Sequence, residues 1–187
     1  MAIPPGEESA VGYFASHLLA LLGYDVANRF IRQRKDIPLF MCGAQTHAKT
    51  DVCVIDRNLE IPVLLVQEDK SYLEVEVPDP KPQLIAQAIA AFQHNNTHLQ
   101  RMGVQPIRAK TMPGITMMGS TPTFYKIAMT QDLVDAVETA EYPASPAIMH
   151  KLIPPVDDLA RLSQNGMKPL NNRAVILGCF EAFKQFV

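Results

Sequence analysis

The sequence contains no tryptophan, and its three cysteines cannot all pair with one another or match the spacing of a zinc motif. No apolar stretch approaches the ~20 residues that a membrane-spanning helix needs. The segment from Met1 to Glu8 lacks the basic start and apolar core of a secretory signal peptide. These absences predict an intracellular protein, cytoplasmic or nuclear, that has no membrane partner.

Several common functional signatures are also missing. The nine glycines are scattered, so there is no glycine-rich phosphate-binding loop, and no G-x-S-x-G nucleophile elbow occurs. His94 and His98 stand four residues apart, but no glutamate follows His94 as in the H-E-x-x-H zinc motif. The formal net charge is −2, whereas a dedicated nucleic-acid binder is usually basic.

The 187 residues are enough for one domain with a sizeable core. Apolar residues at helical spacing predict a first helix from about residue 8 to residue 22, with Gly23 as its stop. Further helices are predicted over 82–94 or beyond, 131–140 and 172–186, and fraying is expected at Asn95-Asn96. Strands are predicted over 24–41 (irregular, with a turn near Lys35-Asp36), 51–55, 61–70, 115–118 and 124–129, with a loop or strand end over 43–49 and an extended proline-rich segment over 141–156.

The two strands over 51–55 and 61–70 are apolar on both faces, as in the centre of a sheet that helices cover on both sides. The fold class predicted is therefore α/β, a single domain over 1–187 with a central mixed β-sheet flanked by helices. Its core spans about 7–130, and a C-terminal helical extension spans about 131–187. Cys53 lies within the first of these strands and is expected to be buried and reduced.

Glu68, Asp69 and Lys70 form an acidic-basic triplet at the end of the second apolar strand. In a strand, residues two apart point to the same face, so Glu68 and Lys70 share one side. If the two apolar strands are neighbours, Asp51 converges on the same place. Two carboxylates and an ammonium group at a strand end can hold a divalent metal ion and activate a water molecule.

This arrangement resembles the catalytic core of the PD-(D/E)XK nuclease superfamily, whose restriction-endonuclease-like core runs helix, three strands, helix, strand (α-β-β-β-α-β). Glu68-Asp69-Lys70 matches the E-x-K pattern, and Thr50-Asp51 stands where the family often has Pro-Asp. The resemblance implies that Asp51 and Glu68 bind Mg²⁺ or Mn²⁺, together with the backbone carbonyl of Asp69. It also implies that Lys70 orients or activates the attacking water.

Three further residues are candidates through the same resemblance. Glu8 stands on the first helix, from which family members often supply an acid to the metal; the alternative is that it complements the helix dipole. Gln83 and Gln87 are one turn apart on the second helix, where many members carry a glutamine that positions water or phosphate. The alternative for both is an exposed polar side chain.

A basic segment offers candidates for phosphate contacts. The residues proposed as substrate-binding are Gln83, Arg29, Arg32, Arg34 and Lys49, with Lys35 adjoining them. The alternative is a solvated, charged strand edge. His47 could face the same site, or be a solvated loop residue.

The leading functional hypothesis is a divalent-metal-dependent nuclease that acts on DNA or RNA. The alternative is a catalytically silent module of the same fold that binds a protein partner, which the slight negative charge and an acidic, proline-rich segment over 72–82 also suit. A third interpretation makes Glu68 and Lys70 a surface ion pair of little energetic value.

Overall fold

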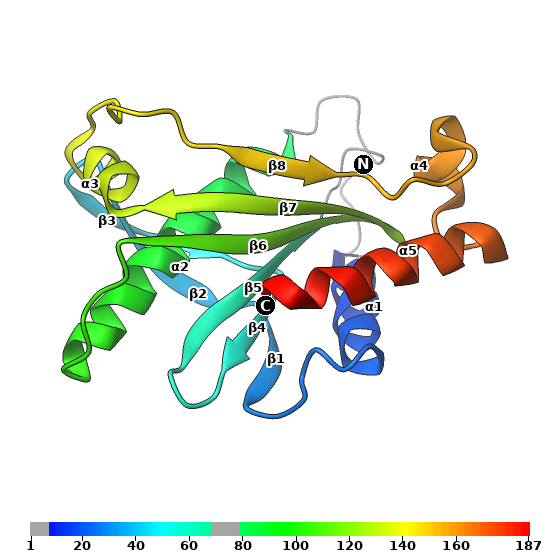
Figure 1. Cartoon of the computed structure of the whole chain (residues 1–187), viewed down its shortest axis with the longest axis horizontal. Helices are drawn as coiled ribbons and strands as arrows, with labels where there is room; N and C mark the ends of the chain where they lie inside the picture. Colours follow the sequence, from blue (N-terminus) through cyan, green and yellow to red (C-terminus); the bar gives the residue numbers. More distant parts are fainter. Residues whose placement is uncertain (1–7, 69–78) are drawn as a thin grey trace.

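A six-stranded mixed sheet forms the centre of the molecule and carries helices on both faces (Figure 1). The computed structural model describes residues 8–68 and 79–187. The helices are α1 (Glu8–Leu21), α2 (Pro80–Arg101), α3 (Gln131–Thr139), α4 (Leu162–Asn165) and α5 (Leu170–Phe183), with 3-10 turns η1 (Leu159–Arg161) and η2 (Lys184–Phe186). The strands are β1 (Arg29–Gln33), β2 (Asp36–Met41), β3 (Ala44–Lys49), β4 (Val52–Asp56), β5 (Ile61–Glu68), β6 (Ala109–Met118), β7 (Thr121–Thr130) and β8 (Met149–Leu152).

The strand order is β1-β4-β5-β6-β7-β8, and β2 and β3 form a separate two-stranded sheet. β5 and β6 are parallel, whereas the other neighbours in the large sheet are antiparallel. Parallel neighbours need a long crossover connection. Here α2 lies in that connection, which fixes this helix against one face of the sheet.

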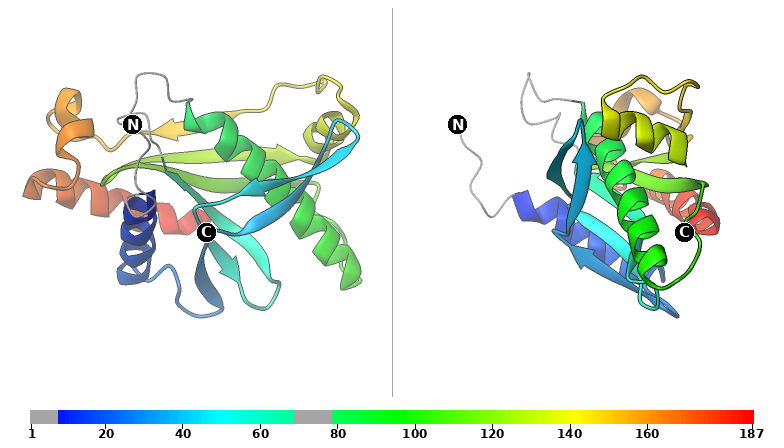
Figure 2. Two further views of the ribbon diagram at one scale, coloured as in Figure 1. Left: turned by 180° about the vertical axis from the view of Figure 1, so that it is seen from behind. Right: turned by 90° about the vertical axis from the view of Figure 1, so that its left-hand side faces the viewer.

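Two apolar clusters cover the two faces. One packs the inner sides of α1 and α5 on Val52, Val54, Leu64 and Val66. The other packs α2, α3 and the β2–β3 sheet on Cys53, Ile55 and Leu65. In Figure 1 α5 crosses the near face, and the left view of Figure 2 shows α2 across the opposite face. The predicted α/β class, the mixed central sheet and the two-sided burial of β4 and β5 are confirmed.

The segment 24–41 differs from the single irregular strand expected. It divides into β1, which joins the edge of the large sheet, and β2, which pairs with β3 in the small one. The loop or strand end expected over 43–49 is instead β3. Arg34 has a positive φ of 51°, and its N–H donates to the Asp51 carbonyl at 2.9 Å. The chain therefore turns sharply between β1 and β2, close to the turn expected near Lys35-Asp36. The pairing of β2 with β3 in a separate sheet was not expected.

The second helix is longer than its apolar pattern indicates, and the fraying expected at Asn95-Asn96 is wrong. Pro80 occupies its first turn, where proline is tolerated, and Asp79 caps it by accepting from the Lys81 N–H at 3.0 Å. Asn95 Nδ2 donates to the Pro62 carbonyl, and Asn96 exchanges hydrogen bonds with the backbone of Ile107. Tertiary partners thus override the weak helix propensity of asparagine.

The other elements agree more closely with expectation. Gly23 has a φ of +73° just after α1 and ends it as predicted. The last helix packs on the core through Ile176, Phe180 and Phe183. Within 141–156, expected to be wholly extended, β8 adds an edge strand beside β7. No helix in residues 8–68 and 79–187 has the length and apolar character needed to cross a bilayer.

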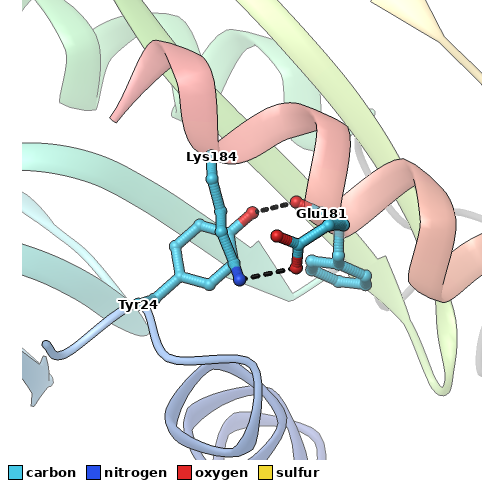
Figure 3. Close-up of polar contacts among 4 residues, drawn as sticks. Tyr24, Glu181 and Lys184 are labelled. Carbon is cyan, nitrogen blue, oxygen red and sulfur yellow. Dashed lines mark hydrogen bonds and ion pairs between the residues drawn. The ribbon is translucent and has the colours of Figure 1, made fainter.

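Tyr24 anchors the end of α1 to α5. Its hydroxyl donates to the Phe180 carbonyl at 2.7 Å, and its ring meets Phe180 edge-on at 6.4 Å between centroids (Figure 3). Lys184 lies over the same ring while pairing with Glu181 at 2.6 Å. Burial, with a smaller contribution from Glu181, raises the pKa of Tyr24, so the phenol stays protonated as the donor.

Tyr24→Phe removes this buried hydroxyl and should lower the free energy of unfolding by about 1 kcal/mol. Denaturant titration followed by circular dichroism measures the change. Tyr13→Phe is the matched control, because Tyr13 is 54% exposed on α1. Equal losses in the two variants would show that the Tyr24–Phe180 bond contributes nothing specific.

Cys53 is fully buried in β4, as predicted, whereas Cys42 is exposed. Burial raises the pKa of the Cys53 thiol above its usual range and so depletes the reactive thiolate. In the native protein a thiol reagent should modify Cys42 quickly and Cys53 only when the fold opens. Peptide mapping by mass spectrometry after timed labelling reports each site, and comparable native rates would contradict the central position of β4.

Candidate functional site

Asp51 and Glu68 meet at one end of the β4–β5 pair. Val52 pairs with Val66 in the antiparallel register, which sets the start of β4 beside the end of β5. Asp51 lies in a bend directly before β4, and its Oδ2 accepts the backbone N–H of Glu68 at 2.7 Å. The two acids that the sequence singled out are therefore neighbours at one end of the β4–β5 pair.

The contact joins the Asp51 carboxylate to the backbone N–H of Glu68. The side chains of the two acids therefore lie in different surroundings. Glu68 is 7% exposed and alternates with Leu64 and Val66, which face α1 and α5. Asp51 is half-buried, and the register puts it beside Gln67, whose side chain turns toward α2. Because Asp51 reaches the main chain of β5, its carboxylate lies at the end of the sheet, between the two faces.

The other proposed metal and catalytic residues are less defined. Asp69 and Lys70 lie outside the described residues, as does the side chain of Glu8. Among residues 8–68 and 79–187, no group of three or more histidine, cysteine or acidic side chains is arranged to hold a metal ion. Two carboxylates with water and substrate oxygens are nevertheless a sufficient set for Mg²⁺. The donor chemistry of Asp51 and Glu68 fits that ion.

Gln87 comes from α2 and is completely buried beside this end of the sheet. Its Nε2 donates to the Lys49 carbonyl at 2.7 Å and to Oε1 of Gln67. Gln67 Nε2 in turn donates to the Glu68 carbonyl at 3.3 Å. A chain of amides thus connects α2 to the backbone at the ends of β3 and β5, next to Asp51 and Glu68.

This amide chain includes a residue that the sequence analysis missed. The sequence pattern places Gln67 in an apolar strand and assigns it no role. A glutamine among five aliphatic residues is nevertheless a signal of a buried polar contact. Gln87 Oε1 is buried and has no hydrogen-bond partner within the described part of the chain. Such an acceptor suits a bound water molecule. Gln83 is exposed one turn earlier and takes no part.

The basic residues proposed to bind substrate do not form one patch. Arg29 donates through Nη2 to the Val187 carbonyl, on the side of α5. Arg32 and Lys35 line a hollow on the opposite side, next to α2. Arg34 and Lys49 are exposed near Asp51, and His47 is exposed in β3. Side chains alternate between the two faces of β1, so Arg29 and Arg32, three residues apart, point to opposite faces. Their closeness in the sequence does not show this separation.

Comparison with known proteins adds no identification. The chain matches no protein-family model and no curated protein. The candidate site is accordingly defined by its own geometry: an acid at the start of β4, an acid at the end of β5, and the Gln67–Gln87 amide chain behind them.

Gln87→Ala should destabilise the protein by about 2 kcal/mol, because the Lys49 carbonyl and the Gln67 amide lose a buried partner. Gln83→Ala, one turn away and exposed, should change the unfolding free energy by less than about 0.5 kcal/mol. Urea unfolding of both variants beside the wild type gives the comparison. If both substitutions are neutral, Gln87 does not hold α2 to the strand ends.

Proposed function

We propose that this chain is a metal-dependent nuclease of the PD-(D/E)XK type. The supporting observation is the contact between Asp51 at the start of β4 and Glu68 at the end of β5. The order of elements agrees as well, since α1, β1, β4, β5, α2 and β6 follow the family's helix, three strands, helix and strand, with β2 and β3 inserted.

Asp51 and Glu68 would hold Mg²⁺ or Mn²⁺, with the backbone carbonyl of Asp69 as a further ligand and Glu8 as an added acid from α1. The ion would supply Lewis-acid polarisation of a phosphodiester oxygen and a more acidic bound water. The position of Asp51 supports its role, because its carboxylate lies at the end of the β4–β5 pair and belongs to neither apolar cluster.

Lys70 takes its role from the E-x-K resemblance. It orients the attacking water toward phosphorus and stabilises the negative charge that develops on the phosphoryl oxygens. Gln87 positions water through Oε1, while its Nε2 holds Lys49 and Gln67 in place. Its contribution therefore combines support of the strand ends with one buried acceptor that can hold a water molecule.

Lys70→Ala should reduce cleavage of nucleic acid by ~10²–10³-fold, because an electrostatic contact to the transition state is lost. Purified wild type and variant are compared on single- and double-stranded DNA and on RNA, with Mg²⁺, with Mn²⁺ and with chelator. Lys168→Ala serves as the matched control, since Lys168 is exposed on a distant turn before α5. Cleavage that persists in chelator, or equal activity in both variants, would assign the activity to another source.

Asp51 allows metal binding to be separated from folding. Asp51→Asn keeps an oxygen that accepts the Glu68 N–H, so the fold should remain stable, but it removes the negative charge that holds a cation. Asp51→Ala removes both and should lower stability by about 1–3 kcal/mol. Titration of Mn²⁺ followed by electron paramagnetic resonance should show loss of binding in Asp51→Asn and unchanged binding in Asp25→Asn, an exposed acid outside the site.

The catalytically silent module is the competing function, and these experiments decide between the two. A stable wild-type protein that binds no Mn²⁺ and cleaves no substrate would favour the silent module. In that case the Asp51–Glu68 contact acts as a clamp that closes the end of the β4–β5 pair.

A further inference from the structure

An open hollow of about 620 Å³ lies between the edge strand β1 and the C-terminal half of α2. His94, His98 and Arg101 stand at i, i+4 and i+7 on α2 and therefore share one stripe of the helix. Facing them are residues of β1 and of the turn after β4. The residues that matter for recognition are Phe30, Arg32, Lys35, Arg57, His98 and Arg101.

The hollow is strongly basic although the whole chain is slightly acidic. Arg32, Lys35, Arg57 and Arg101 bring four full positive charges to its lining, and Glu60 is the one acid among the described lining residues. The ion pairs of the described residues lie elsewhere, at Lys81–Asp79, Arg161–Asp158 and Lys184–Glu181. Four positive charges gathered around a single acid repel one another, and an anion bound among them relieves that repulsion.

Part of this lining is already oriented. Arg57 Nε donates to the Arg29 carbonyl at 3.2 Å, and the Arg57 guanidinium lies 5.6 Å from the centroid of the Phe30 ring. These two contacts engage Nε and one face of the guanidinium, and neither uses the terminal nitrogens of Arg57. A guanidinium held in advance loses less side-chain entropy when it binds a ligand.

His94 lies within the influence of these charges. Burial is the main cause that lowers its pKa, and the positive charges of Lys35 and Arg101 lower it further, while a hydrogen bond with the Glu60 backbone opposes the shift. The imidazole is half-buried at the base of the α2 stripe. An uncharged ring here is consistent with a positive field that the protein itself does not neutralise.

We propose that this hollow is a phosphate-binding site, which takes the phosphate groups of a nucleic acid or of a free polyphosphate-bearing ligand. Three guanidinium groups present paired N–H donors that match phosphate oxygens in a bidentate manner. The hollow adjoins the Asp51 region, because the Lys35 carbonyl accepts the Thr50 N–H at 3.0 Å. Binding needs neither a divalent ion nor cleavage, so the site does not depend on the nuclease proposal.

The test measures binding by the full chain in the presence of chelator. Fluorescence anisotropy follows a labelled single-stranded DNA oligonucleotide, and unlabelled tripolyphosphate and poly-glutamate serve as competitors. The pocket variant is Arg32→Gln/Arg101→Gln, and the matched control is Arg108→Gln/Arg161→Gln. All four arginines are exposed, and each variant removes two positive charges.

We expect the pocket variant to weaken DNA binding at least tenfold at low salt and the control to change it less than threefold. The slope of log K against log salt should fall by roughly 1.4 in the pocket variant, which is two contacts at ~0.7 each for a single strand. Arg32→Lys/Arg101→Lys should keep most of the salt slope but bind more weakly, since it retains charge and loses the paired donors. Melting curves establish that each variant is folded.

Two results would support the site and identify its ligand. Competition by tripolyphosphate together with DNA binding indicates a nucleic-acid backbone site. Pocket-dependent binding of tripolyphosphate without DNA binding indicates a free phosphate ligand. Equal weakening in the pocket and control variants, no binding of any phosphate probe, or tighter binding of poly-glutamate than of tripolyphosphate would overturn the proposal.

Discussion

Burial of β4 and β5 on both faces is the constraint from which the rest of the structure follows. Val52, Cys53, Val54 and Ile55 are each at most 1% exposed, so apolar cover is needed above and below the sheet. α1 and α5 supply it on one face, and α2 supplies it on the other. Polar side chains are thereby displaced to the strand ends, which is why Asp51, Gln67 and Glu68 gather there.

α2 links the two candidate ligand sites, which are the strand ends at Asp51 and the basic hollow. Its N-terminal half is tied to the strand ends through Gln87, and Asn95 fixes its middle to the Pro62 carbonyl. Its C-terminal half then carries His98 and Arg101 along the basic hollow. Since one rigid helix spans both sites, their separation is set by the helix rather than by flexible loops. A phosphate-bearing ligand in the hollow would therefore have a fixed relation to Asp51.

Net charge is a poor guide to the local charge of this protein's surface. The formal value of −2 averages over surfaces that differ greatly, and four basic side chains lie beside β1 and α2, with Glu60 as the one acid among the described lining residues. Arg29 lies close to Arg32 in the sequence, but its guanidinium donates a hydrogen bond to the Val187 carbonyl instead of lining the hollow. Affinity for phosphate depends on such local groupings, because screening limits the reach of exposed charges to about 8–10 Å.

The sequence by itself determined the α/β class, the two central strands, the buried Cys53 and the pairing of Asp51 with the end of β5. These follow from local patterns, in which apolar runs of strand length and helical periodicity leave few alternatives. Tertiary structure decided the rest. β2 and β3 pair with each other in a separate sheet. Hydrogen bonds from Asn95 and Asn96 to the backbone extend α2 to Arg101, and packing joins Gln67 to Gln87. The basic hollow likewise assembles residues from β1, from the turn after β4 and from α2. Contacts between such distant segments depend on the folded geometry rather than on any local sequence pattern.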